Sequence, residues 1–170
     1  MQQGSGARLV RDLLYGAIGG LVGTAVMDQV TTLMYYKLES EEGRKREESI
    51  GGESMPRAVI RIVSQALTGA RPSDGTVSKL APAVHWAYGA TWGALYGLAH
   101  DRAPALSAAG GAPFGATFWL VGDEGLPTAL GFAPPPQAFP VTSHVRGLVA
   151  HLVYAAAADG VYRALRRLAG

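Results

Sequence analysis

Four long apolar segments alternate with polar stretches along the chain, over residues 13–36, 80–99, 105–121 and 141–162. About 20 apolar helical residues suffice to cross the hydrocarbon core of a bilayer. The pattern therefore predicts an all-α, polytopic membrane protein: a four-helix transmembrane bundle in which residues 1–170 form a single membrane domain. The third span is the shortest and is interrupted by Pro113, which membrane helices tolerate when neighbouring groups satisfy the freed backbone.

The loop over residues 37–79 is the only strongly charged stretch, with eight basic and seven acidic residues. Inside it, residues 56–70 place apolar side chains on one helical face and Arg57 and Arg61 on the opposite face. This pattern predicts a short amphipathic helix. It would lie in the membrane interface, where such helices bind by apolar burial and attraction to anionic lipid, or pack on the protein's own extramembrane surface.

The distribution of basic residues indicates an orientation. Four spans place both termini on one side, and residues 122–142 contain no Lys or Arg. Under the positive-inside rule both termini are cytoplasmic, although the eight basic residues of the 37–79 loop argue for the opposite orientation. The run Pro134 to Pro136 cannot continue a helix, so residues 122–142 are expected to form a loop.

Glycines recur four residues apart in three of the spans, for example at Gly16/Gly20, Gly89/Gly93 and Gly111/Gly115. Small residues at this spacing let membrane helices approach closely. Tight packing between the spans is therefore expected. The glycine faces could also join copies of the chain into a homo-oligomer.

Composition agrees with a bilayer environment. Charged residues make up 16% of the chain, against roughly 25% in soluble domains, and 23 residues are glycine. The net charge is only +2, and no basic run carries the interleaved aromatic residues of a nucleic-acid groove, which argues against a nucleic-acid partner. The absence of cysteine excludes disulfides, thiolate metal sites and cysteine nucleophiles.

One pattern occurs twice. His85 is followed by Tyr88 and Tyr96, and His151 is followed at the same spacings by Tyr154 and Tyr162. On a helix these positions share about one face, so the two copies predict equivalent helices with both histidines at the same depth. A two-helix unit duplicated in parallel is a known plan in transporters.

Asp28, in the first span, is expected near that same depth. An ionisable group inside a bilayer costs at least about 2.5 kcal/mol unless it is paired or neutralised, so it should face protein or water. The candidate intramembrane polar site consists of Asp28, His85, His151, Tyr88 and Tyr154. Each of these residues could equally serve helix packing alone.

Four further residues form a secondary set: Asp159, His144, Asp123 and Glu124. The spacing of Asp159 and Arg163 favours an ion pair on one helix face. His100, in the turn after the second span, is expected to be a solvated loop histidine.

Several segments resemble the YagU-like family of uncharacterised bacterial inner-membrane proteins. They are Gly23-Thr-Ala-Val-Met-Asp28, His85-Trp-Ala-Tyr88-Gly-Ala-Thr-Trp-Gly, Gly122-Asp-Glu-Gly-Leu-Pro127 and the helix from His144 to Asp159. The resemblance implies a small polytopic protein of the bacterial inner membrane. It supplies no substrate, so no functional residue is carried over from it.

Three classes of function fit these residues. The leading one is transport or sensing of protons or ions, since intramembrane ionisable groups form relays and histidine titrates near neutral pH. A second is binding of haem b or a metal ion by His85 and His151. A third is a structural or accessory subunit of a membrane complex. An enzyme is disfavoured, because no nucleophile elbow, Walker loop or dinucleotide fingerprint is present.

Overall fold

The computed structural model describes residues 4–50 and 53–170, and within these ranges it contains helices and no strand. The all-α prediction is therefore confirmed. The elements are α1 (Ser5–Leu33) with its π-helical continuation η1 (Met34–Leu38), α2 (Glu41–Ile50), α3 (Met55–Thr68), α4 (Asp74–Arg102), α5 (Pro104–Thr117) with its π-helical continuation η2 (Phe118–Gly125), α6 (Leu126–Ala129), the 3-10 turn η3 (Pro136–Ala138) and α7 (Val141–Leu168).

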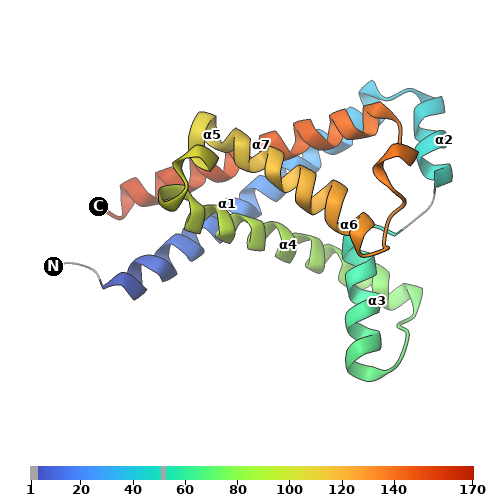
Figure 1. The fold of residues 1–170 in the computed structure, drawn as a ribbon, viewed down its shortest axis with the longest axis horizontal. Helices are drawn as coiled ribbons and strands as arrows, with labels where there is room; N and C mark the ends of the chain where they lie inside the picture. Colours follow the sequence, from blue (N-terminus) through green and yellow to red (C-terminus); the bar gives the residue numbers. More distant parts are fainter. Residues whose placement is uncertain (1–3, 51–52) are drawn as a thin grey trace.

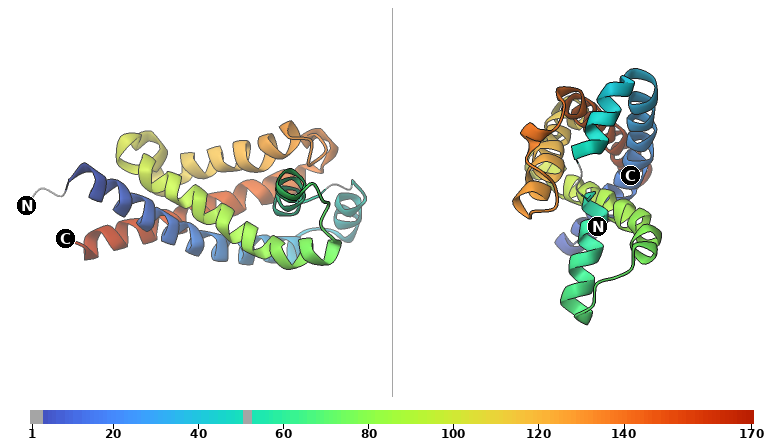
Figure 2. Two further views of the ribbon diagram at one scale, coloured as in Figure 1. Left: turned by 90° about the horizontal axis from the view of Figure 1, so that it is seen from below. Right: turned by 90° about the vertical axis from the view of Figure 1, so that its right-hand side faces the viewer.

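The helices α1, α4, α5 and α7 lie lengthwise against one another, and their directions alternate along the chain (Figure 1). Both chain termini lie at one end of this bundle, which we call the termini end. The opposite end carries α2, α3 and α6, and we call it the loop end (Figure 2). The two copies of the histidine and tyrosine pattern therefore lie on α4 and α7, which run in the same direction.

Glycines bring α1 into backbone contact with two neighbours. A Cβ atom on Gly93 of α4 would lie 2.4 Å from the Gly16 carbonyl oxygen and 2.5 Å from the Gly20 Cα. Gly19, the residue before Gly20 on α1, packs against the backbone of Ala158 on α7 in the same way. The predicted tight packing is confirmed, but these glycines are occupied within the chain, so a homo-oligomer would need a different surface.

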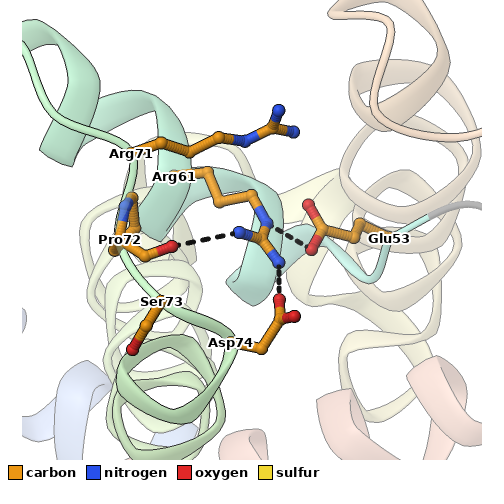
Figure 3. A pocket seen from close by; sticks show the side chains of 6 residues that line it. All are labelled: Glu53, Arg61, Arg71, Pro72, Ser73 and Asp74. Atoms are coloured by element: carbon orange, nitrogen blue, oxygen red, sulfur yellow. Dashed lines mark hydrogen bonds and ion pairs between the residues drawn. The ribbon is translucent and has the colours of Figure 1, made fainter.

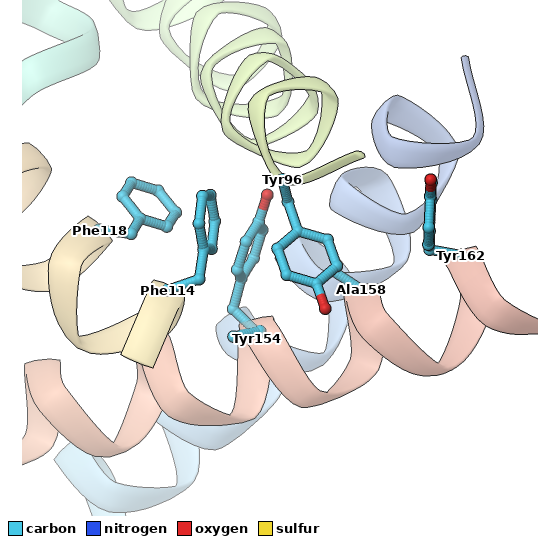
Figure 4. Close-up of a cluster of buried hydrophobic side chains, with 7 residues drawn as sticks. Tyr96, Phe114, Phe118, Tyr154, Ala158 and Tyr162 are labelled. Atoms are coloured by element: carbon cyan, nitrogen blue, oxygen red, sulfur yellow. The ribbon is translucent and has the colours of Figure 1, made fainter. Parts of the chain in front are cut away.

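Aromatic side chains fill the space among α4, α5, η2 and α7. Figure 4 shows Phe118 and Phe114 on one side of Tyr154 and Tyr96 of α4 on the other, with Tyr162 farther along α7. Trp92 stacks on Phe118 at a centroid distance of 4.4 Å, whereas Tyr96 meets Phe114 and Tyr154 meets Phe118 edge-on. Edge-on and offset contacts are the arrangements that aromatic quadrupoles favour.

The third predicted span has wrong bounds. Residues 105–121 are not one helix, because Ala109, Gly110 and Gly111 adopt positive φ and turn the chain back on itself. Glycine takes this conformation without steric cost. Helix then runs from residue 112 past Gly122 to Ala129, so Pro113 lies in a first turn, where its missing N–H does no harm. The predicted loop over 122–142 thus begins only after Ala129.

The charged loop contains two helices, α2 and α3, and the second is the predicted amphipathic helix, over Met55–Thr68 instead of 56–70. It runs across the long direction of the bundle at the loop end (Figure 1). Ala58 and Ile60 near its start are buried, whereas Leu67 near its end is 80% exposed. Arg61, on the polar face, forms ion pairs with Glu53 and Asp74, as Figure 3 shows.

Among the described residues, one helix is long and apolar enough to cross a membrane by length and composition, Ser5–Leu38. It packs against α4 and α7 and carries exposed apolar side chains along its length, including Leu14 and Leu33. This supports association with a membrane.

Candidate functional site

The central contact of the candidate site joins two helices. His85 Nε2 of α4 lies 2.9 Å from Asp28 Oδ1 of α1. Their side chains are 33% and 44% exposed, so the pair lies at the edge of the bundle and not in its core. The close approach of α1 and α4 at Gly20 and Gly89, two turns of α1 away, sets the two side chains within hydrogen-bonding distance.

His151 occupies a different environment. It is 5% exposed, its Nδ1 lies 2.8 Å from the Gly147 carbonyl of its own helix, and its ring meets Phe118 edge-on at 4.5 Å. Because a carbonyl can only accept, Nδ1 carries the proton and Nε2 is the free acceptor when the ring is neutral. The structure thus brings Asp28 and His85 together and gives His151 other partners.

Asp123 lies against α7 one helical turn before His151. A Cβ atom on Gly147 would lie 3.4 Å from Asp123 Oδ2, and Asp123 itself is exposed. Asp123 and Glu124 are carried by the π-helix η2, and π-helical segments recur at functional sites. Asp123, Glu124 and His144 of the secondary set therefore lie at the loop end with the primary site, whereas Asp159 lies toward the opposite end of α7.

His144 is held by two acceptors. Its Nδ1 lies 2.7 Å from Glu124 Oε1, and its Nε2 lies 2.9 Å from the Pro136 carbonyl oxygen. The carbonyl requires an N–H at Nε2, and an ionised Glu124 requires an N–H at Nδ1. The geometry is therefore that of an imidazolium paired with a carboxylate, and it ties the start of α7 to η2 and η3.

The tyrosines of the repeated pattern bond mainly to the backbone. Tyr88 donates to the Gly122 carbonyl at 3.1 Å, and Tyr154, which is fully buried, donates to the Gly89 carbonyl at 2.6 Å. Each bond joins two neighbouring helices. Tyr88 and Tyr154 therefore fix the packing next to the site and do not contact its histidines through a hydrogen bond.

The contacts extend the internal repeat to α1 and α5. Gly20 packs against Gly89, and Gly115 packs against Ala155, which lies 66 residues after Gly89, the same offset that separates the two histidines. The spacing in α1 recurs in α5 and η2, with Gly16, Gly20 and Asp28 in the first and Gly111, Gly115 and Asp123 in the second. Each helical hairpin thus carries one aspartate and one histidine in the same register.

A second polar cluster occupies the termini end. Asp159 is 6% exposed and accepts two hydrogen bonds from Arg163 Nε, at 2.7 and 2.8 Å, which confirms the predicted ion pair. Tyr96 of α4 donates to the same carboxylate. Asp12, also buried, pairs with Arg11 at 3.1 Å.

His100 was expected to be solvated, and that prediction is wrong. Its side chain is 12% exposed, and its ring lies between those of Tyr96 and Tyr162. Helix α4 continues to Arg102, so His100 lies one helical turn after Tyr96 on the same interior face. The four-residue spacing between Tyr96 and His100 could have indicated this interior position from the sequence. It does so only if α4 is predicted to continue to Arg102.

The sequence also gave no indication of the role of Arg146. It is 7% exposed, its Nη2 lies 2.6 Å from both oxygens of Glu47, and its guanidinium packs over the Tyr35 ring at 5.1 Å. These contacts attach α2 and η1 to α7. Residues so far apart in sequence carry no spacing signal, so only the folded chain reveals the pair.

The fit of a metal ion or haem depends on free donor atoms. Among the residues that the structure describes, no group of three or more His, Cys, Asp or Glu side chains is placed to hold a metal ion. Asp28 occupies Nε2 of His85, and Gly147 occupies Nδ1 of His151. One nitrogen remains on each ring, and ligation by both histidines stays a prediction.

Comparison with known families gives one match. The model of a family described as proteins of unknown function, DUF1440, matches residues 67–160, more than half of the 170 residues. This chain belongs to the DUF1440 family. The matched DUF1440 region includes His85, Asp123, His144 and His151, but it begins after Asp28. No curated protein and no solved structure matches the chain.

Proposed function

We propose that this DUF1440 protein is a small multi-pass protein of the bacterial inner membrane, with α1, α4, the helix over residues 112–129 and α7 crossing the bilayer. The distribution of side chains supports this. Large apolar residues lie exposed on the outside of the bundle, among them Ile18, Leu95, Leu120 and Val145. Glycine, tyrosine and polar groups lie inside it, an arrangement suited to lipid surroundings.

The same arrangement accounts for the modest hydropathy of α4 and α7. In α4 and α7 the inward faces carry glycine, histidine and tyrosine, which lower the mean hydropathy of the whole helix. Both are also 28 residues or longer, which at about 1.5 Å per residue exceeds the roughly 30 Å of a hydrocarbon core. Their charged ends would then lie in the headgroup regions.

The position of α3 supports its placement in the membrane interface. The helix crosses the bundle direction at the loop end, as an interfacial helix would (Figure 1). Ile62 and Val63 are each 47% exposed and Leu67 is 80% exposed, so most of the apolar face is uncovered. Packing on the protein's own surface accounts only for the buried first turns. Burial in the headgroup region would cover the rest.

The orientation with both termini in the cytoplasm rests on the lack of basic residues in 122–142. YagU-like proteins are members of the DUF1440 family, and this supports placement in the inner membrane. Fusion of a reporter enzyme to the C-terminus would test the orientation. A cytoplasmic reporter signal is expected, and a periplasmic one would reverse the assignment.

The activity that we propose is proton- or ion-linked transport or sensing through the paired aspartates and histidines. The 2.9 Å contact between Asp28 and His85 carries this proposal. Such a pair shares one proton: a carboxylate with an imidazolium, or a carboxylic acid with a neutral ring. Because histidine titrates near neutral pH, a small change in surroundings moves that proton. The equivalent residues Asp123 and His151 provide a second titratable position at the same end.

Proton flux in proteoliposomes tests this function. The purified parent protein should dissipate an imposed pH gradient, and Asp28→Asn and His85→Ala should each reduce the rate about tenfold or more, as removal of a proton-transfer group does. Lys45→Ala serves as the control, because Lys45 lies on the exposed face of α2 and pairs with Glu41 one turn before it. No flux in the parent would remove the proposal, and unchanged flux in both variants would remove this pair from it.

Two other functions stay predictions from the sequence. Haem or metal binding at His85 and His151 predicts a Soret band or a stoichiometric metal in the purified protein, and a colourless, metal-free preparation would exclude it. A role as a structural or accessory subunit predicts a defined partner that co-purifies in mild detergent.

A further inference from the structure

His100 lies at the termini end of the bundle, in the last turn of α4, far from His85 in the same helix and its partner Asp28. Fifteen residues separate His85 from His100, which corresponds to about 22 Å along a helix. The polar cluster around His100 is therefore separate from the site described above.

Two carboxylates flank the His100 ring, one on each nitrogen. Nδ1 lies 2.7 Å from Asp101 Oδ1, and Nε2 lies 3.6 Å from Asp159 Oδ1. Nε2 is buried and has no hydrogen-bond partner within the described chain. In the neutral ring, with Nδ1–H donated to Asp101, Nε2 presents a lone pair toward the buried carboxylate.

The side chains of Asp159, His100 and Asp101 differ in their exposure to solvent. The Asp159 side chain is 8% exposed, the His100 side chain is 12% exposed and the Asp101 side chain is 51% exposed. The ring therefore stands between a carboxylate in water and a carboxylate in the protein interior. Tyr96 and Tyr162 lie beside the His100 ring, at centroid distances of 5.7 and 4.7 Å, and the exposed carboxylate is its polar neighbour on the water side.

The charges around the cluster are nearly balanced. Arg163 neutralises Asp159, and Arg166 neutralises Asp101. The other titratable or charged groups packed against the cluster are Asp12, Arg102, Tyr96 and Tyr162. An arginine beside a carboxylate lowers the carboxylate's affinity for a proton. A proton that reaches the carboxylate is therefore released again and not trapped.

We propose that His100 passes protons between Asp101 at the surface and Asp159 in the interior, forming the opening of the proton route at the termini end. This inference rests on the proposed function. From the Nδ1–H tautomer the ring is set for the outward step. A proton on Asp159 Oδ1 bonds to the Nε2 lone pair, giving an imidazolium; the Nδ1–H bond then breaks as that proton bonds to Asp101 Oδ1 and passes to water, leaving the neutral Nε2–H tautomer. The inward step is the reverse: a protonated Asp101 gives its proton to Nδ1 of the Nε2–H tautomer, and the Nε2–H bond breaks as that proton bonds to Asp159 Oδ1. Neither step changes an oxidation state, and exchange of the ring protons with water restores the starting tautomer between transfers.

Proteoliposome flux with His100→Gln tests the step, because glutamine can hydrogen-bond but cannot carry a proton through an imidazole. Flux should fall about tenfold or more, as for removal of a proton-transfer group. Free imidazole added to His100→Ala should restore part of it. Tyr162→Phe, which keeps the ring beside His100 and removes only a hydroxyl, is the matched control and should retain the parent rate.

The outcomes separate this inference from the function on which it rests. A parent that conducts, together with a folded His100→Gln that conducts equally, overturns the role of His100 and leaves the function standing. A parent that does not conduct overturns the function. In that case an NMR titration of the parent in micelles decides the role: protonation of His100 should shift the Asp159 carboxyl carbon in the same transition, and an unresponsive Asp159 overturns the inference.

Discussion

The contact between α1 and α4 leaves no room for a side chain at Gly93. A Cβ atom at this position would lie 2.4 Å from the Gly16 carbonyl oxygen, 2.5 Å from the Gly20 Cα and 2.7 Å from the Gly20 nitrogen. Ordinary contacts of a Cβ atom begin at 3.4 Å. All three obstacles are backbone atoms, so no side-chain rotation can relieve them. Gly93→Ala must therefore move the two helices apart.

The size of the effect follows from these distances. Relief of the closest contact requires a separation of about 1 Å, and a gap of that size forfeits a quarter to a half of the dispersion energy across the interface. Insertion of a methyl group into a packed core typically costs about 1–3 kcal/mol. Alanine regains up to about 1 kcal/mol through its higher helix propensity. With three backbone obstacles we expect the upper part of the range, a net loss of about 2 kcal/mol.

Unfolding of the purified protein in detergent micelles, followed by circular dichroism, measures this loss. Gly160→Ala on α7 is the matched control, since a Cβ atom there would meet nothing within 4 Å. The control should be neutral or stabilising, because only the helix-propensity gain acts. If Gly93→Ala is as stable as Gly160→Ala, the close approach of α1 and α4 described here is incorrect.

Three further predictions follow from buried or paired groups. Tyr154→Phe removes the hydroxyl that joins α7 to α4 and should lower the free energy of unfolding by about 1 kcal/mol, measured in the same micelles. Arg146→Ala leaves the carboxylates of Glu47 on α2 and of Glu39, just after η1, without their buried partner; it should cost about 3 kcal/mol and speed proteolytic cleavage near residues 39–50. The His100 ring and the Arg166 guanidinium hold the pKa of the Asp101 carboxyl below its ordinary value of 3.8. A depressed folded-state pKa stabilises the protein above the ordinary value, and this contribution is lost as pH falls through the folded pKa, so Asp101→Asn should make the melting temperature less sensitive to acid between about pH 5 and pH 2.

Each of these has its own control. Tyr162→Phe removes a longer bond, 3.3 Å to Gly97, so an equal loss in both tyrosine variants would contradict the first. Lys45→Ala breaks a fully exposed pair worth little, and equal protease sensitivity in the two variants would show that Arg146 does not anchor α2. Identical acid sensitivity in Asp101→Asn and the parent would mean that Asp101 contributes no pH-dependent stability.

Hydrophobic patterning predicted most of the helical segments, because each helix of the bundle carries apolar residues along its length. It placed the third helix wrongly for a local reason. Ala, Gly and Pro at residues 108–113 are apolar and resemble a span, whereas Gly110 and Gly111 in fact form a left-handed turn. An apolar turn and an apolar helix have the same composition, and only their backbone conformations differ.

The polar residues divide in a similar way. The pairing of Asp159 with Arg163 was predictable because it lies within one helix, where spacing fixes geometry. For Asp28 and His85 the sequence predicted only that the two residues lie at a similar depth in the bundle, not that they are in contact. The pairing of Arg146 with Glu47 was not predictable at all. Depth along a helix comes from counting residues, but the partner across the bundle depends on which faces meet.

The sequence by itself determined the helical class, the amphipathic helix in the charged loop, the glycine faces and the register of His85 with His151. These depend on local periodicity, which a linear chain records directly. Only the tertiary structure decided that the glycine faces pack within one chain, that His100 is enclosed between two carboxylates, and that Asp123 lies against α7 near His151 at the loop end. The rotation of each helix about its axis is set by backbone contacts with its neighbours, and no single segment of sequence specifies that rotation.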